Sequence, residues 1–175
     1  MRKSLTFYQF LGFIVTSILG TLLHFLYEWT DIKFIALFSG VNESVWEHMK
    51  ILFFPLLAYA VFESRYFYND YRNFWCVKLI GILSGLLSIP TMYYTYTGAL
   101  GVSADWFNIT IYFLAAAITY KTETKMLKSK KMFCISQIAA LIILVLITML
   151  FMLFTFFPPK IPLFQDPVTK LYGLI

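Results

Sequence analysis

Ionisable side chains gather at the end of the first apolar segment of the chain and at the start of the second. The stretch HFLYE places His24 and Glu28 at i and i+4, so both project from one face of a helix. The stretch NESVWEHMK then supplies two neighbouring helical stripes, one of Glu43, Glu47 and Lys50 and one of Ser44 and His48. Both histidines of the chain therefore fall in this one region.

Imidazole and carboxylate groups at this spacing predict a metal site. Ligands paired at i and i+4 on facing helices are how helical bundles build mixed nitrogen and oxygen sites, which zinc, manganese and iron accept. Two or three protein ligands would leave a coordination position open, and a spare glutamate could act as general base. The candidate metal ligands are His24, Glu28, Glu43, Glu47 and His48, and the candidate catalytic residues are Glu43, Glu47 and His48.

Two other interpretations of these residues stay open. In one, Glu43 and Glu47 are acids favoured by the positive end of a helix, and Lys50 is their salt-bridge partner. In the other, the residues form a metal-free polar pocket for a charged solute, a lipid headgroup or protons in transit. Further candidates for such a pocket are Asn42, Ser44, Trp46, Lys50, Asp105 and Asn108.

The composition indicates that the solvent around the chain is lipid. Of 175 residues, 60% are hydrophobic and 13% are charged, whereas soluble domains are about half apolar and about a quarter charged. Several apolar runs approach the roughly 20 residues that cross a bilayer. The first run has the basic head of a signal peptide but no small-residue cleavage site, so we expect it to be an uncleaved span.

The apolar runs predict one all-α domain over residues 1–175, a polytopic bundle of five transmembrane helices. The expected helices cover residues 6–27, 46–66, 75–97, 104–121 and 132–157, and an extended external tail follows at 158–175. Small and polar residues recur on one face of the first run, and GILSG repeats the small-residue pattern in the third, so both faces should pack against other helices. Four prolines keep the tail out of a helix. We expect the tail to cover the outer site as a partial lid or to lie on the membrane surface.

The positions of lysine and arginine predict the orientation of the bundle. One side carries ten of them, namely Arg2, Lys3, Arg65, Arg72, Lys78, Lys121, Lys125, Lys128, Lys130 and Lys131, and the other side carries Lys33, Lys50, Lys160 and Lys170. We therefore expect a cytoplasmic N-terminus, an external C-terminus and an external polar site. The net charge of +5 does not indicate nucleic acid, because the charges sort by membrane side.

The two cysteines, Cys76 and Cys134, show no disulfide or metal spacing. Both fall near helix ends on the side predicted to be cytoplasmic, where thiols stay reduced. No disulfide is expected.

Three stretches, LLHFLYEW, GVNESVWEHMKILFFP and PPKIPLFQDPVTKLYG, resemble a family of small bacterial multi-pass membrane proteins known only as a domain of unknown function. The resemblance runs from the first helix to the tail, and its most specific element is the NESxWEHxK motif. It implies a bacterial plasma membrane location and supplies no activity. It places at motif positions His24, Asn42, Glu43, Trp46, Glu47, His48, Lys50, Asp166, Tyr172 and Gly173.

The leading hypothesis is an external site that binds a ligand or a divalent metal such as zinc and hydrolyses a lipid-like or amphiphilic substrate. The alternative is a small-solute transporter or permease component, whose polar lining should continue to the cytoplasmic side. A third class is a non-catalytic membrane subunit. The expected partners are the bilayer and a lipid-like or small-molecule ligand, and whether the chain is an enzyme stays open.

Overall fold

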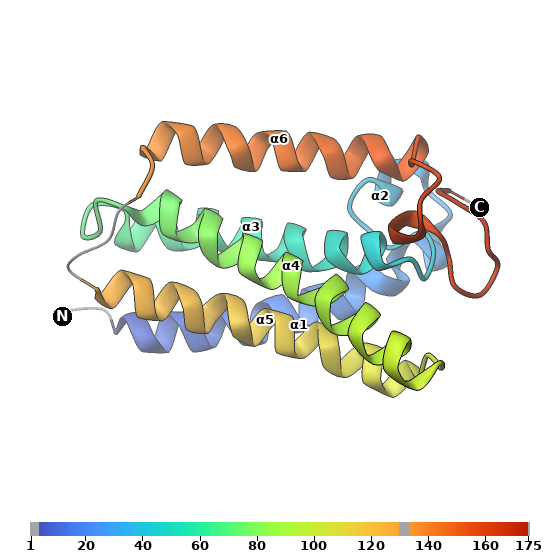
Figure 1. Ribbon diagram of the computed structural model, residues 1–175. Helices are drawn as coiled ribbons and strands as arrows, with labels where there is room; N and C mark the ends of the chain where they lie inside the picture. The colour runs from blue at the N-terminus through green and yellow to red at the C-terminus, as the bar shows by residue number, and fades with distance from the viewer. Residues whose placement is uncertain (1–3, 130–133, 175) are drawn as a thin grey trace.

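Five long helices run along a common axis in the computed structural model, which describes residues 4–129 and 134–174 (Figure 1). They are α1 (Leu5–Thr30), α3 (Val45–Phe67), α4 (Phe74–Leu100), α5 (Asp105–Lys128) and α6 (Gln137–Phe156). A short α2 (Lys33–Ala36) follows α1, and a 3-10 turn, η1 (Pro162–Phe164), lies in the tail. The described residues are all-α, as predicted. The expected start of the last helix at residue 132 lies outside them, as do four of the ten basic residues used for orientation: Arg2, Lys3, Lys130 and Lys131.

Local sequence explains where the long helices begin and end. The hydroxyl oxygens of Ser4, Ser44 and Ser136 accept backbone N–H bonds in the first turns of α1, α3 and α6, which satisfies donors that a helix start leaves free. At the other ends, Asp31 closes α1 and Gly101 closes α4, both in the left-handed conformation.

Four of the long helices form a closed ring. In it α1 packs on α3, α3 on α4, α4 on α5 and α5 on α1, while α6 packs outside this ring against α4. The small and polar stripe of α1 faces the other helices, because Gln9, Gly12, Thr16 and Gly20 are all buried. The predicted inward face of the first helix is therefore confirmed.

The GILSG stretch brings α4 and α5 into close contact. A Cβ added to Gly81 would lie 2.3 Å from Glu123 Cγ, and one added to Gly85 would lie 2.0 Å from Thr119 Oγ1. Only glycine leaves room for the facing side chains here, so the predicted packing role of this motif is confirmed.

Four helices, α1, α3, α4 and α6, are long and apolar enough to cross a membrane by length and composition among the described residues. Large apolar side chains such as Phe10, Ile18, Ile138 and Met149 are exposed on the outer faces of α1 and α6, as a lipid solvent allows. The fifth predicted span, α5, has similar length, but charged residues at both its ends lower its mean hydropathy.

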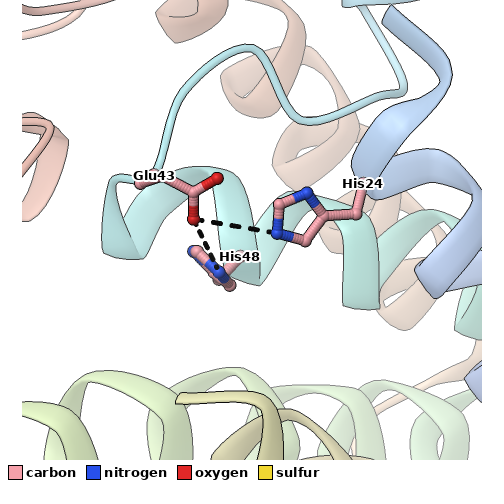
Figure 2. A group of neighbouring side chains, drawn as sticks. All are labelled: His24, Glu43 and His48. Carbon is pink, nitrogen blue, oxygen red and sulfur yellow. Dashed lines mark ion pairs between the residues drawn. The ribbon is translucent and has the colours of Figure 1, made fainter. Parts of the chain in front are cut away.

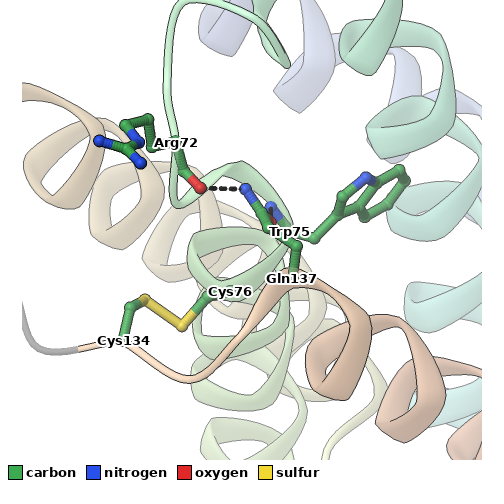
Figure 3. Close-up of a disulfide and its surroundings, with 5 residues drawn as sticks. All are labelled: Arg72, Trp75, Cys76, Cys134 and Gln137. Atoms are coloured by element: carbon green, nitrogen blue, oxygen red, sulfur yellow. Dashed lines mark hydrogen bonds between the residues drawn. A yellow bond between two sulfur atoms is a disulfide. The ribbon is translucent and has the colours of Figure 1, made fainter.

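A disulfide joins Cys76 in the first turn of α4 to Cys134 just before α6, so the expectation of no disulfide is wrong (Figure 3). The cysteines are 58 residues apart in sequence, and only the return of α6 to the start of α4 brings them together. Gln137 reinforces this junction. Its amide nitrogen donates to the Arg72 carbonyl, and its amide oxygen accepts from the Trp75 backbone N–H at 2.7 Å.

The tail folds back onto the start of α3. The ring of Phe164 packs on Trp46, with centroids 4.6 Å apart, and Asn42 Nδ2 donates to the Gly173 carbonyl at 2.8 Å. Asp166 holds a turn within the tail by accepting from the Val168 backbone N–H at 2.7 Å. The tail is thus an ordered part of the same end of the bundle as α2.

Candidate functional site

The connection between α1 and α3 is fixed against the last turns of α1. The Leu23 carbonyl accepts from the Gly40 backbone N–H at 3.1 Å and also from the Ser39 hydroxyl. The Ser39 oxygen in turn accepts from the Tyr27 backbone N–H at 2.9 Å. These bonds bring the start of α3 beside His24, which lies one residue after Leu23.

The first turn of α3 then sets the position of His48. Ser44 is the N-cap, and Asn42 Oδ1 accepts from the Ser44 backbone N–H at 2.9 Å. Ser44 therefore serves helix capping, and its carbonyl lies 2.9 Å from His48 Nδ1. A carbonyl oxygen only accepts, so Nδ1 is the donor and the lone pair of this imidazole resides on Nε2.

Three side chains, His24, Glu43 and His48, converge at this end of the bundle (Figure 2). Glu43 Oε2 lies 3.7 Å from His24 Nε2 and 3.6 Å from His48 Nε2. One ligand atom from each residue lies within 4.8 Å of the other two. The side chains are 29%, 48% and 19% exposed, respectively, so solvent reaches the group while protein surrounds most of it.

The two distances from Glu43 Oε2 are close to the edges of a metal coordination sphere. Ligands about 2.1 Å from a tetrahedral zinc ion lie about 3.4 Å from one another. The Nε2 lone pair of His48 faces a carboxylate oxygen, and two acceptors at 3.6 Å repel unless a proton or a cation lies between them. The bond from His48 Nδ1 to a backbone carbonyl is also the usual outer contact of a metal-bound histidine.

Two small cavities adjoin this cluster. The larger, of about 170 Å³, is lined by His24, His48 and mostly apolar side chains from α1, α3 and α5. Phe25, Ile109 and Phe113 in its wall are themselves exposed on the outside of the bundle. The smaller, of about 20 Å³, is lined by Glu43 and His48 and, from α5, by Asn108 and Tyr112.

Glu47 does not lie where a metal ligand or catalytic residue of this cluster would. It is buried, and its Oε2 lies 2.5 Å from Lys50 Nζ and 3.1 Å from the Val41 backbone nitrogen. Lys50 also donates to the Ala36 carbonyl and to Thr155 Oγ1, each at 2.9 Å. Glu47 is therefore the counter-ion of Lys50, as one interpretation of the sequence held, and lies outside the three-residue cluster.

The remaining candidates divide into near and distant groups. Asn108 lines the smaller cavity with Glu43 and His48, and its Oδ1 accepts from the Tyr96 hydroxyl. Glu28 and Asp105 are exposed and take no part in the cluster. Trp46 packs on Phe151 and Phe164 toward α6 and the tail.

The tail contributes no lining residue to either cavity within its described part. It covers the side of α3 that carries Asn42 and Trp46. The tail therefore supports the start of α3 and covers Asn42 and Trp46 of the predicted outer site, while its described residues line neither cavity beside the histidines.

A second charged cluster lies near the opposite end of the bundle and was not predicted as a site. Lys78 of α4 bonds to Glu63 of α3 and, at 2.5 Å, to Glu123 of α5. Gln9 Nε2 of α1 donates to Glu63 Oε1 at 2.7 Å. From the sequence Lys78 served only as an indicator of membrane side, yet Glu63, Lys78 and Glu123 are all fully buried. The sequence feature that could have indicated this cluster is a charged residue flanked by apolar neighbours, as in VKL around Lys78.

The chain belongs to DUF6512, described as a family of unknown function, whose family model matches residues 2–174. The match covers nearly the whole chain, so all the elements described above belong to the family's domain. Comparisons with curated proteins and with solved structures found no match.

Proposed function

We propose that this protein is an integral membrane protein whose cluster of His24, Glu43 and His48 binds a divalent metal ion, with zinc the best-fitting candidate. The observation that carries the proposal is the convergence of two imidazoles on one carboxylate oxygen at 3.6 and 3.7 Å. Two nitrogen ligands and one oxygen ligand suit zinc. Cysteine ligands are not required, because carboxylate and imidazole groups alone form many zinc sites.

The metal site supports hydrolysis of an amphiphilic substrate as the activity. A zinc ion held by three protein ligands keeps a fourth position open, which is the arrangement of hydrolytic zinc sites. The adjoining cavity of about 170 Å³ is mostly apolar and reaches side chains exposed on the outside of the bundle. An alkyl chain from the bilayer could occupy this cavity while its polar end contacts the cluster.

For the membrane arrangement, we propose five spans with α5 as the fifth, a cytoplasmic N-terminus and an external site, in a bacterial plasma membrane. α5 closes the ring between α4 and α1, so a bilayer that surrounds the ring also surrounds α5. The excess of lysine and arginine at the N-terminal end of the bundle supports this orientation, and the Cys76–Cys134 disulfide at that end is the observation that opposes it, because disulfides are rare in the cytoplasm.

A transporter or a non-catalytic subunit is less well supported. Transport of a solute requires a polar cavity that continues past the site, whereas the larger cavity meets α1 only between Gly20 and Phe25. Farther along the same stripe, Thr16 is buried and shares a hydrogen bond of 2.7 Å with the Tyr120 hydroxyl. These polar groups bond to each other across packed helices.

Metal content and hydrolysis test the proposal separately. Purified full-length protein should bind one zinc ion per chain, and His24→Ala, Glu43→Gln and His48→Ala should each lose it. Glu28→Gln is the matched control, because Glu28 lies one turn from His24 on α1 and is exposed. Chromogenic acyl esters and phosphodiesters with short and long alkyl chains then probe activity, which should depend on zinc and increase with chain length. Wild-type protein that binds no divalent metal overturns the metal site, and zinc-loaded protein without hydrolysis overturns the activity alone.

A further inference from the structure

The charged cluster of Glu63, Lys78 and Glu123 has one negative charge without a partner. Two carboxylates face a single ammonium group, and all three side chains are fully buried between α3, α4 and α5. A buried charge without compensation is strongly unfavourable, and more so where lipid replaces water outside the bundle. The folded cluster therefore needs one further positive charge.

The hydrogen bonds of Gln9 point to the same place. Its Nε2 donates to Glu63 Oε1 at 2.7 Å, whereas its Oε1 is buried and has no hydrogen-bond partner. A buried amide oxygen needs a donor. Neither Glu63 nor Glu123 supplies one while both are ionised, because carboxylates only accept.

The two carboxyl groups differ in what they accept. Glu63 receives Lys78 on Oε2 and Gln9 on Oε1, so both its oxygens face donors, as an ionised carboxylate requires. Glu123 receives Lys78 on Oε2, and the side chain of Gln9 lies within interaction range of its carboxyl group. A proton on Glu123 would give Gln9 Oε1 the donor that it lacks.

From the charges and hydrogen bonds we infer that this cluster is a proton-binding site, in which Glu123 carries a proton and donates it to Gln9 Oε1 while Glu63 and Lys78 stay ionised. A metal cation fits less well, since it would adjoin the Lys78 ammonium group. The cluster is also tightly packed, with Glu123 Cγ 2.3 Å from where a Cβ on Gly81 would lie. A proton needs no such volume.

The other ionisable groups around the cluster do not supply the missing charge. The Tyr59 hydroxyl of α3 donates to the Tyr8 carbonyl at 2.7 Å, and the Tyr120 hydroxyl of α5 bonds to Thr16. The Lys78 ammonium lies 5.9 Å from the Tyr120 ring centroid. Helix α6 has no ionisable side chain between Gln137 and Phe156.

Infrared spectroscopy of the full-length protein in lipid nanodiscs tests the inference directly. At neutral pH the wild type should show the carbonyl stretching band of one protonated buried carboxylic acid. Glu123→Gln should lose this band and keep the fold, because the glutamine amide can donate to Gln9 Oε1 in place of the acid. Glu63→Gln should also lose the band, since Glu123 then becomes the only carboxylate that pairs with Lys78. The exposed variant Glu28→Gln should retain it.

The pH dependence of stability gives a second readout. A folded state that holds one more proton than the unfolded chain becomes less stable as pH rises. Wild-type stability should therefore fall as pH rises from about 4.3, where an ordinary glutamate side chain loses its proton, to the higher pH at which Glu123 loses its proton in the fold, and Glu123→Gln should remove this fall. Absence of the band in the wild type, or its persistence in Glu123→Gln, overturns the inference whatever the metal content of the histidine cluster.

Discussion

At the scale of single residues, the chemistry of this chain depends on which glutamate pairs with which cation. The sequence places Glu43 and Glu47 one turn apart, so either could form an ion pair with Lys50 or contact the histidines. In the structure Glu47 forms an ion pair with Lys50, and Glu43 lies between His24 and His48. Helical spacing indicated the group but not this division, because the division depends on Val41, Ala36 and Thr155, which approach from other elements.

Replacing Lys50 tests the buried pair. Lys50→Met leaves the Glu47 carboxylate buried without its counter-ion, and removing one partner of such a pair costs about 3–5 kcal/mol of folding stability. The double variant Glu47→Gln/Lys50→Met removes both charges and should lose less than Lys50→Met alone. Equilibrium unfolding in detergent measures the difference, and a double variant less stable than Lys50→Met would contradict the pairing.

At the scale of helices, the positions of the elements follow from the sequence better than their partners do. Apolar runs predicted five long helices, and the structure contains all five, with bounds within three residues of the expectations except that α5 extends to Lys128 instead of 121 and α6 starts at Gln137 instead of 132. The pairing of α4 with α6 was not predictable, since the disulfide partners are 58 residues apart and no local pattern links them. The buried Glu63–Lys78–Glu123 cluster was missed for the same reason, because each residue comes from a different helix.

The contact between α4 and α5 depends on small residues. Gly85→Ala should destabilise the protein by about 1–3 kcal/mol through overpacking, because the new Cβ would meet Thr119 Oγ1 and the Ala115 carbonyl. Gly98→Ala in the same helix is the matched control, since nothing lies within 4 Å of an added Cβ there. It should be neutral or stabilising by about 1 kcal/mol, from helix propensity alone. Thermal unfolding of the two variants side by side measures this contrast, and equal effects would argue against close packing at Gly85.

The disulfide should contribute measurably to the attachment of α6. Reduction of Cys76–Cys134 should lower stability by about 2–4 kcal/mol. Thermal unfolding with and without reductant measures this loss, and Cys76→Ser, which cannot form the bond, should show no response to reductant. A wild type that is equally stable in both conditions would show that the bond does not hold α6.

At the scale of the whole molecule, ionisable groups occupy the two ends of an apolar bundle. The histidine cluster and the Glu47–Lys50 pair lie at the end that holds α2 and the tail, and the Glu63–Lys78–Glu123 cluster lies toward the end that holds the N-terminus (Figure 1). Composition predicted the all-α class and the lipid surroundings, because apolar content and helix length need no tertiary information. The tail shows the limit of such inference, since its prolines predicted its extended form but not the side of α3 that it covers.

Five crossings place the two termini on opposite sides of the membrane, whereas four would place them together. Reporter fusions that are active only in the cytoplasm should therefore be active at the N-terminus and inactive at the C-terminus. Maleimide labelling in intact cells adds a check on orientation, because disulfides persist in oxidising compartments and are rare in the cytoplasm. Cysteines that can be labelled only after reduction in cells would favour the reverse orientation, and activity of both fusions would exclude five spans.

X-ray absorption spectroscopy of the zinc-loaded protein tests the proposed site most directly, because it reports the ligands of the ion itself. We expect a shell of nitrogen and oxygen atoms at about 2.0–2.2 Å, with the outer-shell signature of two imidazoles from His24 and His48. His48→Ala should lose the bound zinc and with it this signature. A shell without imidazole, or one that is unchanged in His48→Ala, would contradict a metal site at His24, Glu43 and His48.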